Sequence, residues 1–173
     1  MKIKSRLLRR GVILTTLFLF TMVSLSPAAT LQLPKGTDVK VKFTQGMKLS
    51  SGTLGQGVPI ICHLAEDVRI GDKVVVEAGA QATAVVSDVK KSKGGGKGGY
   101  IKISFNELET KGAYNTVDGS KIKLSGYIEN TGKGKGFFPY LFFVLFLKGS
   151  QGEISTDAVY TVKVAESVIL ESK

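Results

Sequence analysis

Apolar and polar residues alternate along most of the chain after residue 30, and no stretch keeps a helical period over three turns. In 37–43, for example, Val39, Val41 and Phe43 fall on one face of an extended chain. Comparable runs occur at 58–64, 81–89, 100–108, 122–128 and 159–165, with a short edge strand expected at 168–170. We expect 68–78 to form a hairpin with its turn at Gly71-Asp72. The pattern predicts an all-β, mainly antiparallel fold, either a single β-barrel or a sandwich.

Turn signals separate these runs. Asp118-Gly119 lies between two of them and predicts a hairpin with a type I′ turn. A further pattern recurs at 33–37, 76–80 and 154–158: an apolar residue, two spacers, a residue that tolerates positive φ, and a small residue. Each copy precedes an alternating run, so we expect three strands to begin with similar turns.

The amino-terminal segment predicts export. Basic residues at 2–10 are followed by an apolar run at 11–25 and then by Ser26-Pro27-Ala28-Ala29. We therefore expect a signal peptide at 1–28 and one exported β-domain at 29–173, periplasmic or associated with the outer membrane. An uncleaved anchor is the alternative, although the apolar run is short for a bilayer core of about 30 Å.

Removal of this segment changes the charge. Five of the 24 Lys and Arg residues, and none of the 14 Asp and Glu residues, precede residue 11, so the net charge falls from +10 to +5. A moderate positive charge favours anionic surfaces such as lipid headgroups or acidic glycans. Without a recognition motif or a tryptophan, the exported chain is not expected to bind nucleic acid.

Candidate catalytic chemistry is sparse. Cys62 is the one cysteine and His63 the one histidine, and as neighbours in a strand they point to opposite faces, so they cannot pair as nucleophile and base. A typical zinc site needs more such ligands. We therefore expect no catalytic residues, no metal and no cofactor, and a buried Cys62.

An uncharged apolar block at 137–147 is the first candidate contact segment. It contains five phenylalanines and one tyrosine. Three alternatives remain open: a buried strand or short helix, a membrane-surface insertion, or a protein interface. The residues expected to make a membrane or partner contact are Phe137, Phe138, Tyr140, Leu141, Phe142, Phe143, Leu145 and Phe146.

Two loops rich in glycine and lysine, at 90–99 and 132–136, are the second candidate. They are either flexible solvated loops or anion-binding loops. The side chains expected to face an anion are Lys91, Lys93, Lys97, Lys133, Lys135 and Lys148.

The order of these motifs is similar to that in the carboxy-terminal β-barrel domain of TrbI-like proteins of conjugation and type IV secretion machines. The resemblance runs from 33–37 through 66–80, the first glycine-lysine loop, Asp118-Gly119 and the apolar block to Lys148-Gly149. It implies a β-barrel that assembles into rings, with the apolar block where that family carries membrane-inserting helices. The chain departs from the family because it lacks a long periplasmic linker and its block is too short for a helical hairpin.

Together these features predict a non-catalytic domain of the cell envelope that acts as an assembly or surface-binding module. Its expected partners are envelope proteins or an anionic lipid or glycan surface, and it is a possible homo-oligomer. The alternative is a soluble carrier that holds a hydrophobic ligand within a β-barrel.

The export prediction has a direct test. When the full chain is produced in bacteria, we expect intact-mass measurement of the recovered protein to show a chain beginning at Ala29, because the small residues Ser26 and Ala28 occupy the positions that signal peptidase requires. A chain that retains residues 1–28 would instead support the uncleaved anchor.

Overall fold

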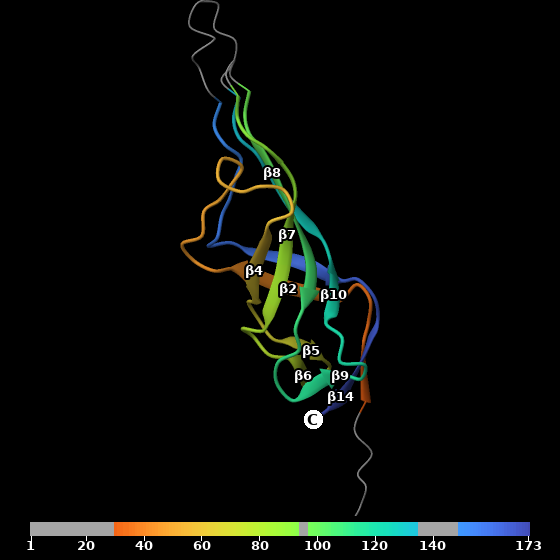
Figure 1. Ribbon diagram of the computed structural model, residues 1–173. Helices are drawn as coiled ribbons and strands as arrows, with labels where there is room; N and C mark the ends of the chain where they lie inside the picture. Colours follow the sequence, from red (N-terminus) through yellow and green to blue (C-terminus); the bar gives the residue numbers. More distant parts are fainter. Residues whose placement is uncertain (1–29, 94–96, 135–148) are drawn as a thin grey trace, which may run out of the picture.

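The computed structural model describes residues 30–93, 97–134 and 149–173. These parts of the chain form fourteen β-strands and contain no helix. The described part of the molecule is elongated (Figure 1), with β8 (Tyr100–Leu108) near one end and β9 (Tyr114–Thr116) and β14 (Val168–Ser172) near the other.

Six of the strands close into an antiparallel barrel. They are β2 (Asp38–Phe43), β4 (Pro59–Leu64), β7 (Gln81–Lys90), β8 (Tyr100–Leu108), β10 (Ile122–Ser125) and β13 (Val159–Val164). Around the barrel their order is β10, β13, β2, β4, β7, β8, and pairing of β8 with β10 completes the circle. The predicted all-β antiparallel fold is confirmed, as a barrel rather than a sandwich.

Alternating side chains fill the barrel. In β2, Val39, Val41 and Phe43 are buried while the residues between them are exposed. Large and small residues face each other across strands, as where Ala84 of β7 lies opposite Phe105 of β8. The Phe105 ring stacks on that of Phe43, with ring centroids 5.8 Å apart. Aromatic pairs at this separation are worth about 0.5–1.5 kcal/mol beyond the burial of their area.

One end of the barrel carries two small sheets. In the first, β14 (Val168–Ser172) lies between β1 (Thr30–Leu33) and β9 (Tyr114–Thr116). The prediction of an edge strand at 168–170 is therefore wrong, because β14 pairs on both sides. The second sheet is the hairpin of β5 (Val68–Ile70) and β6 (Lys73–Val76), which forms as predicted.

The type I′ turn predicted at Asp118-Gly119 is also wrong. Such a turn needs positive φ at both central residues, and only Gly119 has it, with φ of 69°. The amide of Gly119 donates to the carbonyl of Thr116 at 3.1 Å, and the Asp118 carboxylate accepts from Ser120. This turn joins β9 to β10, which belong to different sheets, so no hairpin forms.

The repeated turn is confirmed in two of its three predicted copies. Gly36 and Gly79 have φ of 84° and 78° and precede β2 and β7. At the third predicted copy, 154–158, no residue has positive φ. The third such glycine is instead Gly119, which precedes β10. Around the barrel, the strands that follow these glycines alternate with the other three: β2, β7 and β10 alternate with β4, β8 and β13.

At the other end, β7 and β8 continue past the barrel wall. There β11 (Tyr127–Thr131) pairs with β8. Nearby, β3 (Leu49–Ser50) pairs with β12 (Glu153–Ile154). Figure 1 shows β7 and β8 rising toward this end, away from the carboxyl terminus and β14.

Burial of Cys62 is confirmed and has a chemical consequence. Desolvation raises the pKa of its thiol to about 12, and the side chain is fully buried. Since the thiolate is the reactive form, we expect native protein at pH 8 to react with a thiol reagent such as DTNB only at the rate of unfolding. Rapid stoichiometric labelling without denaturant would contradict this position for Cys62.

Candidate functional site at the lysine-bearing end

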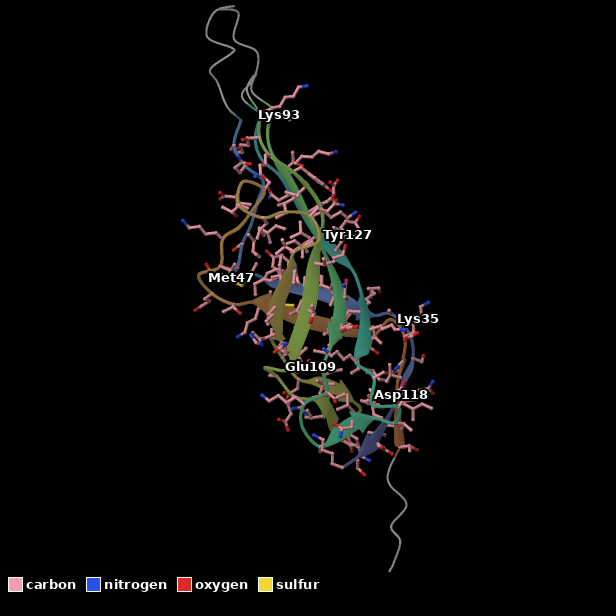
Figure 2. The ribbon with its side chains drawn as sticks, in the orientation of Figure 1. Lys35, Met47, Lys93, Glu109, Asp118 and Tyr127 are labelled. Carbon is pink, nitrogen blue, oxygen red and sulfur yellow. The ribbon has the colours of Figure 1, made fainter. Side chains whose placement is uncertain are left out.

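Four of the predicted anion-facing lysines lie together at the extended end of the barrel. Lys91, Lys93 and Lys97 are exposed on the connection between β7 and β8, and Lys133 is exposed just after β11. Figure 2 shows Lys93 at the end opposite Asp118. We call these four residues the lysine end. Lys135, Lys148 and the apolar block at 137–147 lie outside the described residues.

Main-chain hydrogen bonds join the two loops that carry these lysines. Gly132 donates to the carbonyl of Gly99 at 2.7 Å, and Gly99 donates to that of Ser150 at 2.8 Å. Ser150 in turn donates to the carbonyl of Lys133 at 3.1 Å. The chain that leaves the barrel after β11 and the chain that returns before β12 therefore lie side by side, against the first loop.

A polar cluster lies beneath the loops. The Gln151 Oε1 atom accepts from the Ser51 hydroxyl at 2.7 Å and from the Ser92 amide at 3.1 Å, and Nε2 donates to the Ser92 hydroxyl at 2.6 Å. Ser51 also accepts from the Gly152 amide at 3.0 Å. Ser51 and Ser92 are buried, so these bonds satisfy groups that water does not reach.

Glycines allow the segments to approach so closely. A Cβ atom on Gly132 would fall on the Ser150 carbonyl, and one on Gly152 would lie 2.5 Å from the Asn130 carbonyl oxygen. Similar backbone contacts surround Gly98 and Gly149, whereas a Cβ atom on Gly99 would meet the side chains of Ser51 and Gln151. We call Ser51, Ser92 and Gln151, with Gly98, Gly99, Gly132, Gly149 and Gly152, the collar.

Positive and negative charges are distributed unevenly along the molecule. No Asp or Glu occurs at 89–106 or 130–152. Six other cations lie within 4.0 Å of a carboxylate: Lys40, Arg69, Lys102, Lys121, Lys123 and Lys163. Within the described ranges, no lysine of the lysine end makes such an ion pair. The described part of the lysine end therefore carries four positive charges without a carboxylate within 4.0 Å.

The outer face of β8 and β11 carries a small aromatic and charged network. The Lys102 ammonium lies 3.7 Å from the ring centroid of Tyr127, and the Tyr100 hydroxyl donates to Glu129 at 2.9 Å. That hydrogen bond is the main cause that raises the pKa of Tyr100. The Glu129 carboxylate also lies 3.9 Å from the Lys102 ammonium, and it forms no ion pair with the lysine end.

The sequence patterns did not indicate two open hollows, of which the first lies beside β3 and β12 and the second beside β2 and β4. One, of about 420 Å³, is lined by Met47, Lys48 and the segment 153–157 among others. The second, of about 390 Å³, includes His63 and Asp157 in its lining. His63 therefore faces away from buried Cys62, as predicted, and the described ranges contain no group of three or more potential metal ligands.

The collar residues also escaped prediction. Ser51, Ser92 and Gln151 are single polar residues in irregular segments, and nothing in their spacing distinguishes them from solvated loop residues. Only the glycines around Gly99 and Gly132 gave a signal, and it is compatible with either a flexible loop or an anion-binding loop. In the structure these glycines mark close backbone contact instead.

The sequence matches no model of a known protein family, and no curated protein is significantly similar to it. Among the described residues, no helix is long and apolar enough to cross a membrane.

The close packing of the collar predicts that a glycine-to-alanine substitution lowers the stability of the protein more in the collar than outside it. Gly132→Ala forces the Ser150 backbone to move, so we expect it to lower the free energy of unfolding by about 2 kcal/mol or more. Gly55→Ala is the matched control, because its Cβ would meet only Val58, at 3.9 Å, and we expect a change below about 0.5 kcal/mol. Urea unfolding of both variants measures the difference, and equal stabilities would show that the collar tolerates added bulk.

Proposed function

We propose that this protein is a non-catalytic, exported domain of the cell envelope that binds an anionic lipid surface through its lysine end. The observation that carries the proposal is the gathering of four exposed lysines, without an acidic partner, on two loops that hydrogen bonds hold side by side. Elsewhere on the barrel many cations are paired with carboxylates, and such pairs weaken attraction to an external anion.

The lysine end can contribute measurably to the free energy of binding to an anionic membrane. A lysine near an anionic membrane surface contributes about 1 kcal/mol, so four contribute up to about 4 kcal/mol, which alone gives weak and reversible attachment. The described chain stops at Gly134 and resumes at Gly149, both beside the lysine end, and the apolar block at 137–147 lies between these residues in the sequence. Under this proposal its phenylalanines add hydrophobic contact at the same surface.

We further propose that the chain assembles into a homo-oligomer. The barrel fits the fold implied by the resemblance to TrbI-like domains, and ring assembly or another homo-oligomer would place several lysine ends on one surface. The carrier alternative has less support, because side chains from all six barrel strands fill the interior, among them Val41, Ile60, Ile103 and Val162. A ligand there would have to displace them.

Vesicle binding tests the proposal. We expect the chain from Ala29 to co-sediment with vesicles of phosphatidylcholine and phosphatidylglycerol but not with phosphatidylcholine alone. Neutralising the lysine end with Lys91→Gln, Lys93→Gln, Lys97→Gln and Lys133→Gln should weaken this binding at least tenfold, since it removes up to about 4 kcal/mol of attraction.

A control variant removes the same number of positive charges from outside the lysine end. Lys35, Lys42, Lys73 and Lys173 are exposed and form no ion pair with the described carboxylates, so their replacement by Gln also removes four positive charges. We expect this control to weaken binding less than threefold. Equal weakening by both variants would show that net charge alone drives attachment, and absence of binding by the unmodified protein would refute the proposal.

A further inference from the structure

We propose that the collar couples the two lysine loops into one binding unit, with Gln151 as the positioning residue, and that this unit recognises a surface bearing several anions rather than a single soluble anion. This inference rests on the proposed function. It specifies which residues hold the lysines in place and which kind of anion the lysines bind.

Gln151 is placed to connect the loops. Its side chain makes three hydrogen bonds, one to Ser51 and two to Ser92, while its main chain continues from Ser150, which bonds to both Gly99 and Lys133. Ser92 lies between Lys91 and Lys93 in the first loop. One side chain therefore ties the first loop to the segment that supports Lys133.

The surrounding backbone leaves these segments little freedom. The carbonyl of Gly152 accepts from the Ser51 amide at 2.9 Å, and the Ser51 hydroxyl accepts from the Gly152 amide at 3.0 Å. The glycines of the collar are in backbone contact across the same segments. Lysines on loops that are fixed relative to each other lose less conformational entropy when they bind together, so the second contact is gained at lower cost than the first.

Two loops fixed in this way suit an extended array of anions. Lys93 and Lys97 flank one loop, where the Lys93 amide bonds to the Lys97 carbonyl at 3.3 Å, and Lys133 lies on the other. Like charges held at one end repel each other, and an external anionic surface can neutralise both loops together. Lipid headgroups in a bilayer provide such an array, whereas one phosphate ion carries too little charge to neutralise all four lysines.

The experiment compares two glutamine variants. Gln151→Met keeps the length of the side chain but removes its three hydrogen bonds. Gln56→Met is the matched control, because the Gln56 side chain also makes a hydrogen bond, to the Ser87 carbonyl at 3.0 Å, but lies outside the collar. Binding to phosphatidylglycerol vesicles is measured for each, alone and combined with Lys93→Gln, Lys133→Gln or both.

With the collar intact, we expect the effects of Lys93→Gln and Lys133→Gln to be coupled, so that the double variant differs from the product of the single effects at least threefold. In the Gln151→Met background this coupling should vanish and binding should weaken at least fivefold, while Gln56→Met changes neither. Inorganic phosphate at constant ionic strength should not compete with the vesicles.

Amide hydrogen exchange separates the possible failures. We expect Gln151→Met to speed exchange at Gly99, Gly132 and Ser150 while the amides of β2 and β4 stay protected. Faster exchange with unchanged binding and unchanged coupling would overturn the inference and leave the proposed function standing, as would competition by phosphate. Failure of the unmodified protein to bind vesicles would refute both. If Gln151→Met does not fold, Ser92→Ala, which removes one collar hydrogen bond, replaces it in the same cycle.

Discussion

The pairing of β7 with β8 beyond the barrel wall is the constraint on which the lysine-bearing end depends. Within the barrel these strands are two of six, but their pairing continues to Lys90 opposite Tyr100. The extension carries β11 on one side and supplies the loop that contains Ser92 and Gly99. Because long antiparallel pairing is stiff and twisted, it presents this loop at a defined place rather than on a free tether.

Closure of the barrel supplies the stability that this end lacks. The interior is apolar and nearly water-free, whereas the collar is held by polar groups and backbone contacts. Hydrogen bonds of this kind contribute about 0.5–1.5 kcal/mol each, so the collar specifies a geometry more than it stabilises the domain. The barrel keeps its own structure regardless of what the lysines bind.

The barrel was predictable because alternation with period two is a strong local signal. It located β2, β7, β8 and β13 within one or two residues. The strands β3 and β9, of two and three residues, were missed because so short a run shows no period. The position of β14 depended on two partners far away in sequence, which no local pattern reveals. The collar was missed for a related reason: Gln151 meets Ser51 across 100 residues.

The structure contains a second repeat, at the ends of two barrel strands. The strand β4 ends at Leu64, in the sequence Leu64-Ala65-Glu66, and β13 ends at Val164, in the similar Val164-Ala165-Glu166. The Ala65 amide donates to the carbonyl of Lys40, and the Ala165 amide donates to that of Lys123, each in a neighbouring barrel strand. The glycines Gly36 and Gly79 donate to Val164 and Leu64 at the same distance, 2.8 Å. The barrel is therefore built from similar strand and turn units used more than once.

The pairing of β1 with β14 has a practical consequence for how the molecule is oriented. Thr30 lies opposite Glu171 in that pair, so the first described residue and the carboxyl terminus are neighbours (Figure 1). Lys93 lies at the far end (Figure 2). A tag or tether at either terminus would hold the domain by its base and direct the lysines outward, which makes terminal immobilisation on a sensor surface a suitable geometry for the protein.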